Sequence, residues 1–145
     1  TGNGGYPLDQ NVYQSVKGMT AGEAVCRDGG VIILCASCCD GHGGESFFRH
    51  LADSTPEQIL KEARFIPRDR TEPDQWEYQI LARILNRHTV ILVTDECDHA
   101  MLESMHLKTA YSLEEALRTA YSICGNNATA AVIPDGVSVI PEKRK

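Results

Sequence analysis

The sequence predicts an α/β fold, in which a mainly parallel β-sheet lies between two layers of helices. Two continuous apolar runs, 31–36 and 90–93, have the composition of strands that are buried on both faces, as in parallel sheets. Segments with apolar residues at helical spacing alternate with these runs. Capping boxes at 55–58 and 112–115 mark the starts of two helices. Together these patterns predict a three-layer α/β/α arrangement of the Rossmann-like kind.

The first half of the chain begins with a helix that leads into a strand. We expect this helix to begin with Asp9 as its N-cap and to break near Gly18 and Gly22, because glycine weakens a helix. The first strand is expected at 31–36, with Cys35 pointing into the core.

Three helices are expected before the second strand. The first surrounds Phe47, and the second begins with Thr55 as its cap. The third covers 72–86 and carries Trp76 in its buried stripe. The second strand follows at 89–94.

The last part of the chain repeats the order of helix and strand. Ser112 caps a helix that is expected to end near Gly125. The apolar run at 128–133 is then expected to form the third buried strand, which Pro134 stops.

Composition and charge narrow the class of protein. The 145 residues suit one domain over 1–145, and 42% hydrophobic with 23% charged residues is ordinary for a globular protein. The net charge is −6 and the only basic cluster is the tail 143–145, so nucleic acid is not an expected partner. The apolar runs are far shorter than the roughly 20 residues that cross a bilayer, so no membrane association is expected.

The six cysteines are expected to be reduced thiols of a cytoplasmic protein, because no secretory signal accompanies them. The chain begins at Thr1 without a methionine and enters its first helix almost at once. We therefore expect it to be a fragment of a longer protein.

Ligand-binding chemistry is expected at one edge of the sheet. In an open parallel sheet each helix starts at the edge where the strands end, and ligands bind at that edge. The start of the first helix should therefore lie beside the loops 37–44, 95–99 and 134–136.

The first helix carries a phenol, an amide and an ammonium at helical spacing. Tyr13 and Lys17 are four residues apart, and Gln14 and Lys17 are three apart, so all three side chains can share one face. Such a group suits a small carboxylate, with help from the positive potential of a helix N-terminus. The alternative is a solvated helix face with Tyr13 half buried.

The glycine- and cysteine-rich loop after the first strand leaves several interpretations open. It lacks the glycine, lysine and hydroxyl pattern of a phosphate loop and the third glycine of a dinucleotide fingerprint. Cys38, Cys39 and His42 could bind a metal together with Cys97 or His99, or form a redox site. They could also be small residues that fill a tight loop.

The chain also resembles a known family over nearly its whole length. The most specific segment is 4–17 (GGYPLDQNVYQSVK), and the match continues through 29–34, 40–43, 75–83 and 131–134. These segments resemble the C-terminal domain of the nickel-dependent lactate racemase family.

The resemblance implies an isomerase that interconverts the stereoisomers of 2-hydroxy acids with a nickel-pincer nucleotide. The substrate would lie between an N-terminal catalytic domain of the same chain and this domain, with Tyr13, Gln14 and Lys17 close to it as catalytic and substrate-binding residues. The cofactor and its nickel ligand would belong to the N-terminal domain, so no cofactor is expected on this fragment, which should be inactive alone. His42 receives no role from the resemblance. The alternative function is a non-catalytic metal- or ligand-binding module that uses the Cys/His-rich loop.

Overall fold

A computed structural model describes residues 1–142, so the basic tail 143–145 lies outside the described residues. Three parallel strands form the sheet in the order β1-β2-β3, namely β1 (Val31–Cys35), β2 (Thr89–Val93) and β3 (Lys108–Ala110). The described residues also form six α-helices: α1 (Val12–Val25), α2 (Glu45–Asp53), α3 (Pro56–Ala63), α4 (Gln75–Leu85), α5 (His99–Ser104) and α6 (Leu113–Cys124). A short 3-10 helix, η1 (Arg68–Arg70), precedes α4.

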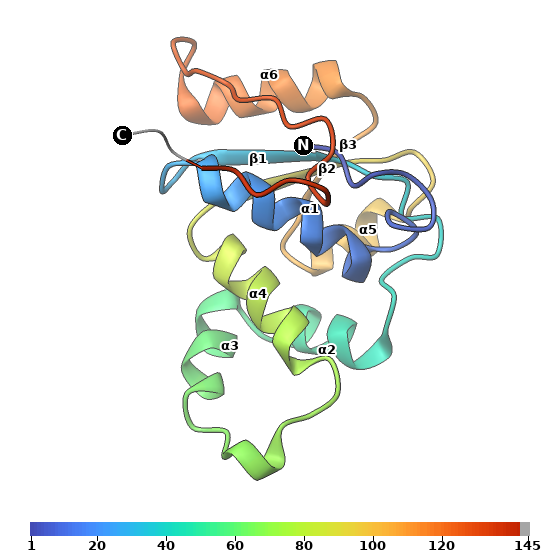
Figure 1. Cartoon of the computed structure of the whole chain (residues 1–145), viewed down its shortest axis with the longest axis vertical. Coiled ribbons are helices and arrows are strands. Elements are labelled where there is room, and N and C mark those ends of the chain that lie inside the picture. The colour runs from blue at the N-terminus through green and yellow to red at the C-terminus, as the bar shows by residue number, and fades with distance from the viewer. Residues whose placement is uncertain (143–145) are drawn as a thin grey trace.

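The sheet lies between two layers of helices, which confirms the α/β/α prediction. In Figure 1, α6 covers one face of the sheet, and α1 lies against the other face with α4 beyond it. Helices α2 and α3 pack on the far side of α4 (Figure 1). No helix within residues 1–142 is long and apolar enough to cross a membrane.

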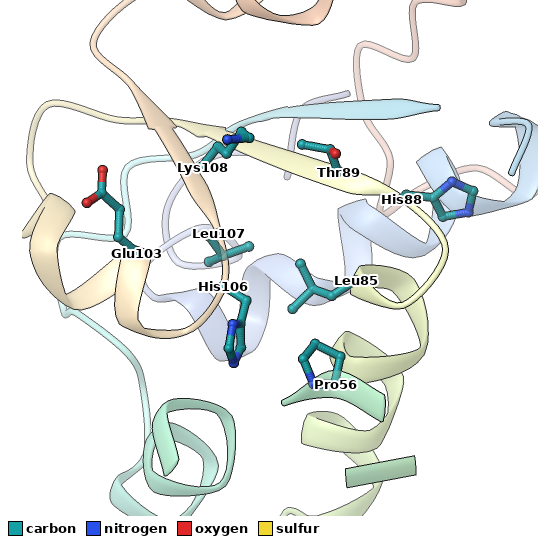
Figure 2. A pocket seen from close by; sticks show the side chains of 8 residues that line it. All are labelled: Pro56, Leu85, His88, Thr89, Glu103, His106, Leu107 and Lys108. Atoms are coloured by element: carbon teal, nitrogen blue, oxygen red, sulfur yellow. The ribbon is translucent and has the colours of Figure 1, made fainter. Parts of the chain in front are cut away.

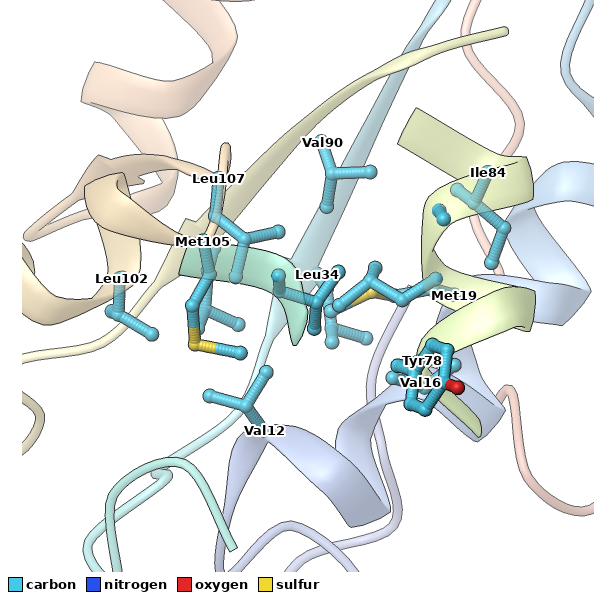
Figure 3. Close-up of a cluster of buried hydrophobic side chains, with 14 of the residues drawn as sticks. Val12, Val16, Met19, Leu34, Tyr78, Ile84, Val90, Leu102, Met105 and Leu107 are labelled. Carbon is cyan, nitrogen blue, oxygen red and sulfur yellow. The ribbon is translucent and has the colours of Figure 1, made fainter. Parts of the chain in front are cut away.

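The main core lies between the sheet and the layer that contains α1. Figure 3 shows Val16 and Met19 of α1 in one cluster with Leu34 and Val90 of the strands and Ile84 of α4. A smaller cluster of Ile91, Ala110 and Ala116 lies under α6. The strands are thus apolar on both faces, as their continuous runs predicted.

The third strand is the main error of the sequence prediction. Residues 128–133 form neither strand nor helix, and Val132 is 85% exposed. The place beside β1 is taken by the N-terminal residues, because Gly2 bridges to Cys35 and the Thr1 carbonyl accepts from the Cys35 N–H. The third strand is β3 instead, which has only Ala110 buried and therefore shows no apolar run.

The first helix starts two residues later than predicted and does not break. Asn11 is its N-cap, and its Oδ1 accepts from the Gln14 N–H at 2.9 Å. The Asp9 carboxylate accepts instead from the Ser37 N–H at 3.2 Å. A Cβ atom on Gly22 would lie 2.7 Å from Cγ2 of Ile32, so the glycine lets the helix approach β1 closely.

Helix caps elsewhere follow the sequence. Thr55 makes the complete capping box of α3, with Pro56 in its first turn. Ser112 caps α6 by accepting from the Glu115 N–H at 3.2 Å, but the predicted capping box is not completed, because the Glu115 carboxylate accepts from the Tyr111 N–H at 2.9 Å. Helix α5, between β2 and β3, is too short for a clear apolar period and was not predicted.

Candidate functional site

The start of α1 and the loop after β1 lie against each other, as the edge prediction required. The carbonyls of Gly41 and His42 accept from the N–H groups of Val12 and Tyr13 at 3.0 and 3.2 Å. Gly43 has φ +87°, and a Cβ atom there would lie 2.8 Å from the Tyr13 Cβ. This loop therefore satisfies backbone donors of the first turn of α1 and fixes where that turn points.

Gln14 and Lys17 form a pair on the surface of α1. The Lys17 ammonium is exposed and donates to Oε1 of Gln14, which is half-buried. With its oxygen turned toward the ammonium, the Gln14 amide presents its N–H2 group to other partners. We call Tyr13, Gln14 and Lys17 the α1 patch.

Tyr13 belongs to the same helix but its hydroxyl points elsewhere. Its O–H donates to Oδ1 of Asp74 at 3.1 Å. The ring meets Phe47 and Trp76 edge to face, with centroids 5.4 and 6.1 Å apart. Burial and the hydrogen bond to Asp74 raise the pKa of Tyr13 to about 12, so the phenol stays protonated at neutral pH. Tyr13 is therefore a fixed neutral wall beside the Gln14–Lys17 pair.

Trp76 lies next to the α1 patch, contrary to the prediction that it is buried. Its side chain is 53% exposed, because α4 begins only at Gln75 and turns Trp76 outward in its first turn. The buried stripe of α4 instead includes Tyr78 and Leu81. A single apolar residue could not show this, since its exposure depends on which face of α4 packs against the other helices.

Glu77 is a second residue that the sequence analysis missed. It is only 1% exposed, and neither of its carboxyl oxygens has a hydrogen-bond partner among the described residues. Burial raises the pKa of Glu77 to about 7, with the Lys17 ammonium opposing the increase and the Asp74 carboxylate adding to it. A signal was present, because Glu77 shares its helix face with Leu81 and Ile84.

The cysteine-rich loop does not assemble the metal site that was one of its interpretations. Within residues 1–142, no group of three or more His, Cys, Asp and Glu side chains is arranged to hold a metal ion. Cys38 is fully buried with its Sγ 3.4 Å from the Ser15 hydroxyl, and burial raises its pKa to about 12. Cys35, predicted to face the core, is exposed at the end of β1, and Cys39 is exposed as well.

His42 has a local structural role in this loop. Its ring stacks on Phe48 with centroids 4.9 Å apart, and its Nδ1 accepts from the Gly44 N–H at 3.1 Å. These contacts hold the loop in place between β1 and α2.

A separate cavity of about 330 Å³ lies at the opposite edge of the sheet. Thr89 and Lys108, the first residues of β2 and β3, line it together with His106 and Pro56 (Figure 2). The Nε2 of His106 is engaged with the Ser54 carbonyl at 3.0 Å. None of the α1 patch lines this cavity, so the two features are independent.

Comparisons with known proteins agree with one another. The family model described as the lactate racemase C-terminal domain matches residues 1–141. The chain is 56% identical over 145 residues to a protein named lactate racemase from Thermoanaerobacterium thermosaccharolyticum, covering 99% of this chain and 34% of that protein. It is 52% identical over 139 residues to one of the same name from Lactiplantibacillus plantarum, covering 95% of this chain and 33% of that protein.

The fold agrees as well. The solved structure of the lactate racemase apoprotein from T. thermosaccharolyticum superposes with a TM-score of 0.95 at 55% identity, over 98% of this chain and 34% of that chain. The chain thus spans about a third of the length of these relatives. It belongs to the lactate racemase C-terminal domain family.

Proposed function

We propose that the chain is the C-terminal, substrate-binding domain of a nickel-pincer-dependent 2-hydroxyacid racemase, and that the α1 patch holds the substrate carboxylate. The observation that carries this proposal is the exposed Lys17 ammonium joined to Gln14 beside the rings of Tyr13 and Trp76. The family to which the chain belongs supports a lactate-like substrate.

The α1 patch suits a carboxylate in charge and in hydrogen-bond direction. Lys17 gives one N–H to Gln14 and keeps two for a ligand, while the Gln14 amide offers two more. A hydrogen bond to a charged group contributes about 1.5–3 kcal/mol, more than a neutral one. Tyr13 and Trp76 would add an apolar wall that limits how the acid can turn.

Fixing the carboxylate serves the chemistry of racemisation. The two stereoisomers of a 2-hydroxy acid share the carboxylate and differ only at the adjacent carbon. A carboxylate held at the α1 patch keeps that carbon in one place while its configuration changes. This is the contribution that the proposal assigns to this chain.

The proposal places the cofactor elsewhere. The side chains of residues 1–142 include no set of three metal-binding groups placed together, so they do not fit a nickel site. The nickel-pincer nucleotide and the groups that move the proton are assigned to an N-terminal domain of the same protein. Exposed Tyr6, Leu8 and Trp76 are apolar side chains that such a domain would cover.

The test uses the full-length protein, loaded with its cofactor, and compares Lys17→Ala with Lys61→Ala. Lys61 is an exposed lysine on α3 and serves as the matched control. Loss of a charge-assisted hydrogen bond predicts a fall in kcat/KM for D-lactate of about 10- to 150-fold in Lys17→Ala, at unchanged circular dichroism. Normal turnover in Lys17→Ala would remove the assignment of Lys17.

A further inference from the structure

We propose that Glu77 couples carboxylate binding at the α1 patch to the uptake of one proton. The inference rests on the proposed function, because it takes a carboxylate ligand at Lys17 as its starting point. The proposed function does not use the buried Glu77 carboxyl, which belongs to α4, the helix packed against α1.

Glu77 lies in a buried position on α4. It projects from α4, which packs against α1, and it is 99% removed from solvent, since only 1% of its surface is exposed. Both carboxyl oxygens are fully covered and have no hydrogen-bond partner in the part of the chain that the structure describes. A carboxylate in such a place is costly unless a nearby positive charge compensates it.

One positive and one negative side chain act on the Glu77 carboxyl. Lys17 of α1 is the cation that acts on it, and Asp74, just before α4, adds a negative charge. Tyr13 of α1 is neutral and donates to Asp74.

The other elements packed against α4 offer no further compensation to Glu77. The charged side chains of these elements are paired away from Glu77 or exposed: Arg49 with Glu45 and His50 with Glu72 from α2, Glu23 with Arg83 from α1, and Glu57, Lys61 and Glu62 on the surface of α3. Strand β2 contributes the apolar residues Val90 and Leu92 on the face of the sheet toward α4.

A carboxylate ligand at the α1 patch changes the charge around Glu77. A carboxylate bound to Lys17 neutralises the charge that stabilises ionised Glu77 and brings a new negative charge close to it. The side chain then takes a proton from solvent and becomes a neutral acid, with no covalent bond made or broken in the ligand. By linkage, the ligand binds more tightly when Glu77 is protonated. Since burial raises the pKa of Glu77 to about 7, this exchange falls in the neutral range.

The direction of the pH dependence follows. Below pH 6, Glu77 is already protonated and the ligand binds without proton uptake. Above pH 7 the carboxyl is ionised in the free protein, and each further pH unit weakens binding by up to tenfold until the complex itself loses the proton. KM for the hydroxy acid should therefore rise about tenfold between pH 6 and pH 8.

The experiment uses the cofactor-loaded, full-length protein and measures KM and kcat for D-lactate from pH 6 to 8.5. Wild type should show the tenfold rise in KM. Glu77→Gln and Glu77→Met, two neutral side chains of similar length, should both keep KM constant within about twofold. Glu62→Gln, which removes an exposed carboxylate on α3, should follow wild type. Groups of the N-terminal domain that titrate affect all four proteins alike, so the comparison isolates Glu77.

Calorimetry gives a second readout that needs no variant. Binding of an equilibrated mixture of D- and L-lactate, which undergoes no net reaction, is measured at pH 7.5 in buffers of different ionisation enthalpy. Wild type should take up most of one proton per bound lactate. Lactate binding without proton uptake, or an unchanged pH dependence of KM in Glu77→Gln and Glu77→Met, would overturn the role of Glu77 while leaving the proposed function intact. A wild type that neither binds nor racemises lactate would overturn both.

Discussion

Replacing Glu77 with glutamine should change how the stability of the chain depends on pH. The folded-state pKa of Glu77 is about 7, against a usual value of 4.5. Between these values the folded state binds more protons than the unfolded state, so the free energy of unfolding falls as pH rises. Glu77 is almost fully covered, so solvent does little to screen its charge.

The size of the effect follows from the two pKa values. Linkage between a pKa of 4.5 and one of about 7 reduces the free energy of unfolding by about 2–3 kcal/mol from pH 5 to pH 8. Glutamine has nearly the same shape and no charge, so the Glu77→Gln variant should lose this decrease. The difference between variant and wild type should therefore grow by about 2–3 kcal/mol over the same interval.

The assay is urea unfolding at pH 5 and pH 8, followed by circular dichroism. Wild type, Glu77→Gln and the surface control Glu62→Gln are compared at both values. Glu62 is exposed, so its variant should track wild type. A difference between Glu77→Gln and wild type that is the same at both pH values would refute the reasoning, because it would mean that Glu77 is ionised in the folded chain already at pH 5.

Two further substitutions test the packing and capping of the fold. Gly22→Ala should lower the free energy of unfolding by about 1–2 kcal/mol, because the new Cβ would lie 2.7 Å from Cγ2 of Ile32. This crowding outweighs the better helix propensity of alanine. A more stable variant would show that α1 and β1 can move apart freely. Ser112→Ala should cost about 1 kcal/mol through loss of the 3.2 Å bond to the Glu115 N–H, while Ser112→Asp should retain most of the stability. Urea unfolding that gives Ser112→Ala the stability of wild type would contradict the role of this cap.

Local patterns in the sequence predicted several elements closely. Strands β1 and β2 fall on the two apolar runs, because both of their faces are covered by helices. Thr55 and Ser112 cap the helices that they were expected to cap, since a cap depends on only three or four neighbouring residues. The closeness of the loop 37–44 to the start of α1 followed from the geometry of parallel sheets.

Errors arose where the outcome depends on distant parts of the chain. Residues 128–133 have the composition of a strand, yet the N-terminal residues occupy the place beside β1. Gly18 was expected to break α1, but the helix continues through it; a Cβ there would lie 2.5 Å from Oδ1 of Asn3 and 3.0 Å from Cδ1 of Leu34, so the glycine serves a close contact instead. Neither competition for a sheet edge nor a close helix–strand contact can be read from neighbouring residues.

The candidate site also combines features that depend on neighbouring residues with features that depend on distant parts of the chain. Neighbouring residues were enough to predict that Tyr13, Gln14 and Lys17 share one helix beside the edge where the strands end, because helical spacing and strand direction are local or topological properties. Three features could be seen only in the folded chain: Tyr13 turns to Asp74, Trp76 is exposed, and Glu77 is buried with no hydrogen-bond partner among residues 1–142. The physical reason is that burial and pairing are set by the surfaces that α1 and α4 present to each other, and these surfaces meet only when the chain has folded.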